Sequence, residues 1–372
     1  MRYSLELPQY IELVGSSFSF FFNVFLLYLI HRFSRPEYGS YRLLMMVMTL
    51  LYVIYSAIEV AVLPSYYIYE YNYLLFTTNF IEYQQLSQVL ITIFCALFAC
   101  MQVVLASQFV YRYFSIAGYT YLQHRYFHGR RHFVWITITV LFFLNWYLMA
   151  MLVFSNNGDH PKELEGSVRE RFGRNINDMA LTLVTYAQWN EQGSVVLKTL
   201  DICMILYLVI CAVSVLFLEM INKPTSQSIP MTISLVCGIK TWLKMHNVAM
   251  SVQKSHRLQR QERQLFFALL FQFSVPFLGN TLPMLILFTC PALHISTEPF
   301  TNYICMLIPF YPIFDASATI FIIKDYYRGV LKMLGCTSYA LNSSTAFDGQ
   351  DVPPNTLFSR SSANPVAESE MM

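Results

Sequence analysis

The sequence predicts an all-α membrane protein: a bundle of seven transmembrane helices with the N-terminus outside and the C-terminus in the cytoplasm. Of its 372 residues, 56% are hydrophobic and only 12% are charged, about half the charged fraction of a soluble domain. One globular core cannot hide so much apolar surface, so lipid is the expected solvent. The alternating pattern of a membrane β-barrel is absent. Seven runs are long enough to cross as helices: residues 13–30, 43–63, 86–110, 133–154, 200–218, 265–288 and 303–323.

The positions of lysine and arginine predict the orientation. Of the 24 such residues, 18 lie in the first, third and fifth connections and in the C-terminal tail, whereas the second and sixth connections have none. Cytoplasmic loops carry the excess of positive charge, so these connections and the tail are expected inside. We therefore divide the chain into a seven-span domain, residues 1–334, and a cytoplasmic tail, residues 335–372, whose Ser, Asn and Pro content predicts disorder. Ser155–Thr199 is the largest external loop.

A second apolar run, Ile229–Ile239, follows the fifth span. Its eleven residues reach only about 16 Å as a helix, too short to cross. An eighth crossing would also place Lys244, Lys254 and Arg257 outside, against the charge rule. Two interpretations remain: a cytoplasmic or interfacial helix, or an insertion around residues 217–233 that splits one long fifth helix.

No motif predicts catalysis or cofactor binding. Hydrolase, zinc-protease, P-loop and dinucleotide signatures are missing, the eight cysteines form no CxxC pair, and no basic cluster is dense enough to predict nucleic-acid binding. His124, His128 and His132 are spaced four apart, as metal ligands on a helix can be. Among neighbouring arginines, a solvated basic face is the expectation, and no metal site is predicted.

Two acidic residues lie inside predicted spans: Glu59 in the second and Asp315 in the seventh. Such groups are costly in a membrane and are usually functional. We expect them at similar depth, facing the bundle interior and joined by water or an ion. The alternative is that each is neutral or bonded to backbone and only fixes helix packing. Glu12 and Asp201 lie at span edges and are expected to reach water.

Prolines predict bends in the last two spans. Pro276 lies in the sixth span, and Pro309 and Pro312 lie in the seventh; each removes a backbone hydrogen bond. Pro276 should free the carbonyl of Gln272, and Pro312 shares a helix face with Asp315. Bent sixth and seventh helices suit a bundle that changes shape.

Three amides begin the third span: Gln84, Gln85 and Gln88. They could line a ligand cavity near the external surface, because a polar side chain facing lipid is expensive. They could equally hydrogen-bond between helices without any ligand.

Several of these stretches occur together in one known pattern. They are Phe22-Asn23-Val24-Phe25-Leu26-Leu27, Gly39-Ser40-Tyr41-Arg42-Leu43-Leu44-Met45, Phe109-Val110-Tyr111-Arg112-Tyr113-Phe114, Arg263-Gln264-Leu265-Phe266-Phe267-Ala268-Leu269 with Gln272 to Pro276, Pro309-Phe310-Tyr311-Pro312-Ile313-Phe314-Asp315 and Ile320–Arg328. Over residues 11–334 the chain resembles the nematode serpentine chemoreceptors of the Str class, which are seven-transmembrane G-protein-coupled receptors.

The resemblance implies a multi-pass plasma-membrane receptor for a small chemical such as an odorant, in the cilia of sensory neurons, acting on a heterotrimeric G protein. It implies G-protein coupling through Tyr111, Arg112 and Tyr113 at the cytoplasmic end of the third helix. A conformational switch would then involve Glu59, Gln272, Pro276, Pro312 and Asp315. The rival hypothesis is a transporter or channel, although no internal repeat is evident. An intramembrane enzyme, the third hypothesis, would require Glu59 and Asp315 to meet.

The chain departs from related receptor patterns in three places. In the broader rhodopsin-like receptors an acid precedes the arginine that ends the third helix, whereas here Tyr111 precedes Arg112. The long external loop has no cysteine for a disulfide to the third helix. The segment Glu219–Ser228 resembles extra sequence inside the fifth helix.

Overall fold

The computed structural model describes residues 6–34, 38–117, 119–155, 160–189, 194–198, 271, 274–297 and 300–335. Met1–Tyr326 form one compact unit and Tyr327–Met372 a second, which contains most of helix α13 (Lys324–Met333). Some sequence predictions lie outside the described residues: the fifth span (200–218), the second apolar run (229–239), the proposed insertion (217–233), Asp201, Gln272 and the tail from residue 336.

Within the described residues, six helical segments are long and apolar enough to cross a membrane. They overlap the first four, the sixth and the seventh predicted spans. The first four are α1 (Glu6–Phe33), α2 (Gly39–Val62), α3 (Gln84–Ala117) and α5 (His132–Leu152). The sixth consists of residues 274–276, the π-helix η4 (Phe277–Thr281) and α10 (Leu282–Ala292). The last comprises α11 (Thr301–Cys305), η5 (Ile308–Phe310) and α12 (Tyr311–Ile322).

The first helix reverses the arrangement of a helix in a water-soluble protein. Three polar residues along one side of the helix are fully buried: Ser16, Ser19 and Asn23. Its large apolar residues point outward: Phe18, Phe21, Phe22 and Phe25. In water this would cost free energy on both faces, but in lipid the apolar face is solvated and the polar face needs protein partners.

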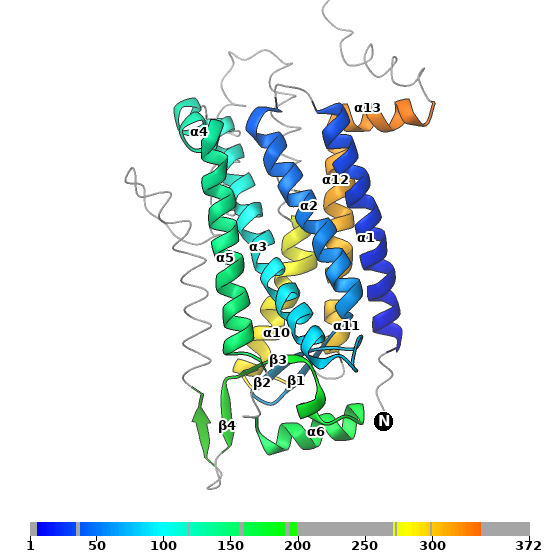
Figure 1. Cartoon of the computed structure of the whole chain (residues 1–372), viewed down its shortest axis with the longest axis vertical. Helices are drawn as coiled ribbons and strands as arrows, with labels where there is room; N and C mark the ends of the chain where they lie inside the picture. Colours follow the sequence, from blue (N-terminus) through cyan, green and yellow to red (C-terminus); the bar gives the residue numbers. More distant parts are fainter. Residues whose placement is uncertain are drawn as a thin grey trace, which may run out of the picture. The chain divides into compact units, whose positions relative to one another are not determined.

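The helices pack in an order that places α2 and α3 at the centre of the described bundle (Figure 1). α1 lies against α2 and α12, and α3 lies against α2 and α5. A short helix, α4 (Thr120–Phe127), and a 3-10 turn, η2 (Gly129–Arg131), connect α3 to α5.

A three-stranded antiparallel sheet, which the sequence pattern did not predict, closes one end of this bundle (Figure 1). β1 (Pro64–Tyr69) follows α2 and pairs with β2 (Asn72–Thr77), which pairs with β3 (Leu181–Thr185). The β1–β2 turn has two residues, and Glu70 adopts a φ of 50°, as tight hairpin turns require.

Both faces of the sheet are buried, in two different clusters. Alternate residues point toward the helices: Tyr66, Ile68, Tyr73, Leu75 and Val184. The others point away from the helices and pack with Leu164 and Val168 of α6 (Lys162–Phe172): Tyr67, Leu74, Phe76 and Leu181. Because side chains alternate along a strand, one face of the sheet packs on the transmembrane helices and the other face packs on α6.

The interpretation of Ser155–Thr199 as a loop is wrong for much of its length. The segment contains α6, the 3-10 turn η3 (Ile176–Asp178), β3, and a hairpin of β4 (Ala187–Trp189) and β5 (Val195–Leu197). α6 begins with Glu163 and Glu165 and ends with Arg169 and Arg171, charges that match the helix dipole. α6 was not predicted because most of its residues are polar, and only Leu164 and Val168 are buried against the sheet.

Candidate functional site

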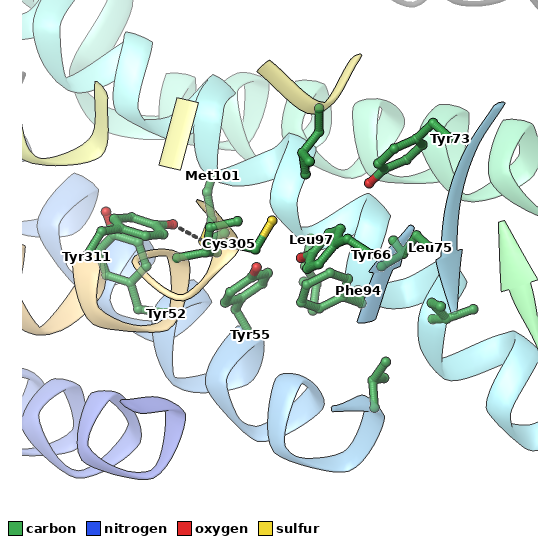
Figure 2. Packing of buried hydrophobic residues seen from close by; sticks show 14 of the residues in the cluster. Tyr52, Tyr55, Tyr66, Tyr73, Leu75, Phe94, Leu97, Met101, Cys305 and Tyr311 are labelled. Atoms are coloured by element: carbon green, nitrogen blue, oxygen red, sulfur yellow. Dashed lines mark hydrogen bonds between the residues drawn. The ribbon is translucent and has the colours of Figure 1, made fainter. Parts of the chain in front are cut away.

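The largest buried cluster fills the space between the sheet and the helices. Tyr55 of α2 stacks on Phe94 of α3 with ring centroids 5.0 Å apart, and Tyr73 of β2 lies 4.8 Å from Phe288 of α10. Figure 2 shows Tyr55, Tyr66, Phe94 and Cys305 gathered in this core. We call this cluster the sheet-end core.

The sheet-end core is aromatic, but it is not apolar. The hydroxyls of Tyr55 and Tyr73 are buried and have no hydrogen-bond partner among the described residues. Asn280 of η4, one turn before Met284 of this cluster, is also fully buried, and neither of its amide atoms has a partner among the described residues. Unpaired buried polar atoms are rare in native proteins and need an explanation. Such atoms can hold a small polar molecule.

Two tyrosines of the sheet stay protonated. Burial raises the pKa of Tyr66 and of Tyr73 well above the ordinary value for tyrosine, because the phenolate would lose its hydration. The Tyr66 backbone N–H donates to Asn302 Oδ1 at 2.9 Å, which fixes β1 to α11. Tyr66 and Tyr73 therefore place neutral hydroxyl groups in the sheet-end core.

A line of polar residues joins α1, α2 and α12. Ser16 Oγ donates to Glu59 Oε2 at 2.7 Å, and the hydroxyls of Ser19 and Ser56 are 2.7 Å apart. Asn23 Nδ2 donates to the carbonyls of Ser19 at 2.8 Å and Pro312 at 3.4 Å. These bonds satisfy most of the buried polar face of α1, although Asn23 Oδ1 has no partner among the described residues. Pro312 contributes its carbonyl oxygen to this line.

The expectation that Glu12 reaches water is wrong. Glu12 is 9% exposed and Glu59 is 1% exposed, and Glu59 is the acidic neighbour that interacts with Glu12. The error arose because Glu12 is close to the chain start, whereas α1 begins six residues earlier and carries Glu12 into the bundle. A glutamate on the same helix face as Ser16 and Ser19 was the signal available in the sequence.

Asp315 lies on α12 near Tyr52 and Tyr311. It is half-buried and close to the Tyr52 hydroxyl. Tyr52 and Tyr311 make an edge-to-face contact at 5.6 Å, and Tyr311 interacts with both Asp315 and Glu59. Glu59 therefore has Glu12 as its acidic neighbour, while Tyr311 lies within electrostatic reach of both predicted carboxylates.

The sixth span changes its winding directly after Pro276. Pro276 is buried, and the next five residues form the π-helix η4, in which Leu282 N–H bonds to the Phe277 carbonyl. A Cβ on Gly279 would lie 2.7 Å from Tyr311 Cβ. Only glycine allows η4 to approach α12 this closely. Tyr311 in turn donates from its hydroxyl to Met101 Sδ of α3 at 3.1 Å.

The seventh span also touches the first through a proline. A Cβ on Gly15 would lie 3.0 Å from Pro309 Cβ. Pro309 is buried, so it serves in the described structure as a packing surface for α1 as well as a helix breaker.

The amides at the start of α3 hold the sheet. Gln88 Nε2 donates to the Leu181 carbonyl at 3.0 Å, and Gln88 Oε1 accepts from the Leu181 N–H at 3.0 Å. Gln84 Nε2 donates to the Asn177 carbonyl at 2.9 Å, and Gln85 is exposed. A ligand role for the three glutamines stays a prediction, but Gln88 already uses both amide atoms within the protein.

The far end of α3 is packed against aromatic neighbours. Tyr111 is buried, stacks on Tyr41 at 5.5 Å and meets Phe127 edge-on at 5.1 Å. Arg112 and Tyr113 belong to the same turns of α3, but their side chains lie outside the described residues. The His124 and His128 rings are 4.5 Å apart. The part of the chain that is described contains no group of three or more residues suited to a metal ion.

Comparison with known proteins gives one consistent result. Residues 8–331 match the family model of the serpentine type 7TM GPCR chemoreceptor Str. The chain belongs to this family. It is therefore a multi-pass membrane receptor of the seven-transmembrane class, with a helical-bundle fold.

Individual relatives are distant but cover nearly the whole receptor. The chain is 24% identical to serpentine receptor class r-10 of Caenorhabditis briggsae, over 88% of this chain and 90% of that protein. It is 23% identical to serpentine receptor class r-10 of Caenorhabditis elegans, over 87% and 89%. G-protein coupled receptor str-33 of Caenorhabditis elegans is 21% identical, over 82% and 84%.

Proposed function

We propose that this receptor binds a small environmental chemical in the sheet-end core and activates a heterotrimeric G protein in response. Membership of the chemoreceptor family supports a receptor role. The observation that carries the location is the set of buried, unpaired polar atoms on three elements: Tyr55 on α2, Tyr73 on β2 and Asn280 on η4. A ligand that bonds to them in one conformation of the bundle shifts the population toward it.

Within this core, we assign to Tyr311 the transmission of a movement of η4 to α3. η4 touches Tyr311 at Gly279, Tyr311 bonds to Met101 of α3, and its ring meets Tyr52 beside Asp315. A rotation of the sixth span about the Pro276–η4 segment would press on Tyr311 and change its bond to α3. π-turns inside helices often occur at functional positions.

The proposed G-protein contact lies at the opposite end of α3. The basic connections there include Arg112, and the charge distribution supports a cytoplasmic location. Tyr111 is packed inside the receptor, so we assign it to the transmission of the movement and reserve direct contact for Arg112 and Tyr113. The family further supports residence in a sensory cilium.

An odorant screen tests this proposal directly. The full chain is expressed in cells that carry a chimeric G protein with a calcium readout, and surface receptor is counted with an N-terminal tag. At least one volatile compound should evoke a response that Arg112→Ala abolishes while surface expression is kept. Solute flux or membrane current without G-protein activation would instead favour a transporter or channel.

A further inference from the structure

The pair Glu12 and Glu59 is not explained by the proposed binding core alone. Both side chains are buried in the bundle, and Glu12 lies one helical turn from Ser16, whose hydroxyl donates to Glu59 at 2.7 Å. Neither forms an ion pair with a lysine, arginine or histidine of the described residues. Glu59 accepts one bond from Ser16, which is a neutral donor. Buried acidic groups without a cationic partner are costly, and inside a membrane they mark functional sites.

The acidic pair lies near the sheet-end core, because Tyr55 of that core is one helical turn from Glu59 on α2. The Tyr55 hydroxyl, fully buried and without a partner among the described residues, interacts electrostatically with both Glu59 and Glu12. Glu12 also interacts with Tyr66 and Cys305 on the other side of this core. The same region therefore combines two carboxylates with the unpaired Tyr55 hydroxyl and the stacked rings of Tyr55 and Phe94, and Figure 2 shows these two rings.

This combination fits an organic cation better than a metal ion. Aromatic faces attract ammonium groups through their quadrupoles, and aromatic residues beside a carboxylate are a known arrangement for such ligands. A metal ion would need three or more acidic, histidine or cysteine ligands together, and the described part of the chain brings no such group together. Alkyl carbons of a ligand would pack on the rings of Tyr55 and Phe94.

We propose that the receptor prefers a small protonated amine, whose ammonium group binds between Glu12 and Glu59 and whose alkyl part occupies the sheet-end core. This inference rests on the proposed function and names its ligand class. Tyr55 would contribute a hydroxyl oxygen to the ammonium group, and Ser16 would keep Glu59 oriented. A neutral compound of the same shape would leave the two carboxylates without a counter-charge.

The test compares an amine with its neutral isostere on the full chain in lipid nanodiscs. The probes are 3-methylbutylammonium chloride, 3-methylbutan-1-ol and, as the ionic control, sodium chloride, each at about 10 mM and pH 7. A ligand that binds only the folded state raises the unfolding temperature. The amine should raise it, whereas the alcohol and sodium chloride should have little effect. Equal shifts with the alcohol or with sodium chloride, or no shift with any primary amine of up to six carbons, would overturn the inference.

Substitutions locate the binding site. Glu12→Gln and Glu59→Gln keep the side-chain shape, and Gln at position 59 can still accept from Ser16. Each should weaken amine binding by about 30-fold or more, as expected when one partner of a buried charge pair is lost. Glu170→Gln, an exposed change on α6, is the matched control and should bind the amine normally. Unchanged amine binding in both core variants would place the cation elsewhere and contradict the proposal.

The odorant screen, run beside this binding test, separates the inference from the proposed function. If a neutral odorant activates the G protein through the wild-type receptor but no amine binds, the amine preference is wrong and the chemoreceptor function stands. If the receptor reaches the surface and neither class of compound ever produces G-protein signalling, the proposed function itself fails.

Discussion

The two ends of α3 are both lined with aromatic residues, yet they treat their polar atoms differently. At the sheet end, the hydroxyls of Tyr55 and Tyr73 are buried without a partner among the described residues. At the opposite end, the Phe127 and Trp135 rings stack at 4.8 Å and Trp135 Nε1 donates to the Tyr126 carbonyl at 2.9 Å.

This difference suggests different roles for the two ends: the sheet end is suited to bind a ligand, and the end near Phe127 and Trp135 is suited to hold helices together. Leaving a buried donor unpaired costs about 1–3 kcal/mol, so the sheet end is suited to bind something that pairs with it. At the opposite end, the Trp135 indole N–H already has its partner. A bound molecule would therefore shift the bundle from the sheet end, while the aromatic joint keeps α3, α4 and α5 together.

The largest effect is expected from a test of which end of the bundle lies outside the cell. Asp159→Thr would make Asn157 a glycosylation acceptor, and Gln253→Asn would create one before Lys254 and Ser255. The charge distribution predicts that only the first is used, because the second and sixth connections, which have no lysine or arginine, are expected outside together with residues 155–199. Endoglycosidase-sensitive gel shifts measure this. Modification of the second acceptor alone would put the sheet end in the cytoplasm.

Gly279→Ala should damage the receptor severely for the addition of a single methyl group. Its Cβ would lie 2.7 Å from Tyr311 Cβ, and overpacking of this kind costs about 1–3 kcal/mol. We expect lower thermal stability and a loss of agonist-evoked signalling. The control is Gly166→Ala on α6, where nothing lies within 4 Å of the added Cβ. Similar behaviour of the two variants would remove Gly279 from the proposed route.

Gln88→Leu tests whether the sheet is held by α3. It removes two hydrogen bonds to Leu181 and leaves both backbone groups of that residue without these partners, at a cost of about 1–3 kcal/mol. The expected result is faster proteolysis of residues 160–198 and weaker surface expression. Gln85→Leu changes an exposed amide in the neighbouring turn and should leave both unaffected. A sheet that is equally protected in both variants would contradict the proposed role of Gln88.

Tyr73→Phe sharpens the comparison with the smallest change. The removed hydroxyl has no partner among the described residues, so thermal stability should not fall. If a ligand bonds to it, agonist potency should drop by about threefold to tenfold, the value of one net hydrogen bond. Trp135→Phe removes the hydrogen bond from the indole N–H to the Tyr126 carbonyl at the other end of α3. This variant should therefore lose thermal stability and keep its agonist potency. The idea fails if Tyr73→Phe loses stability and keeps full potency.

The helical part of this fold was predictable because apolar runs and the positions of charged residues can be identified directly along the sequence. Lipid demands long apolar helices, and the runs that contain α1, α2, α3 and α5 are evident in the sequence. The sheet was not predictable in the same way. Tyr66, Ile68, Tyr73 and Leu75 alternate with residues that are also apolar, because the opposite face packs on α6, so the usual contrast between buried and exposed residues disappears.

The sequence predicted which residue types lie in the site better than it predicted which of those residues contact one another. Glu59 and Asp315 stand out as acids inside apolar runs, but which acid meets which depends on helix rotation and on where a helix begins. α1 starts early enough to bring Glu12 next to Glu59, whereas Asp315 lies beside Tyr52. The π-helix η4 after Pro276 depends on the contact of Gly279 with Tyr311, a tertiary feature that no local pattern encodes.

The most direct test of the central claim is an electron cryo-microscopy structure of the full receptor with an agonist from the screen and its G protein. The claim predicts agonist density in the sheet-end core, within hydrogen-bond distance of Tyr55, Tyr73 or Asn280. Agonist density at the opposite end, near Tyr111 and Phe127, or outside the bundle with these three side chains still lacking a partner, would contradict it.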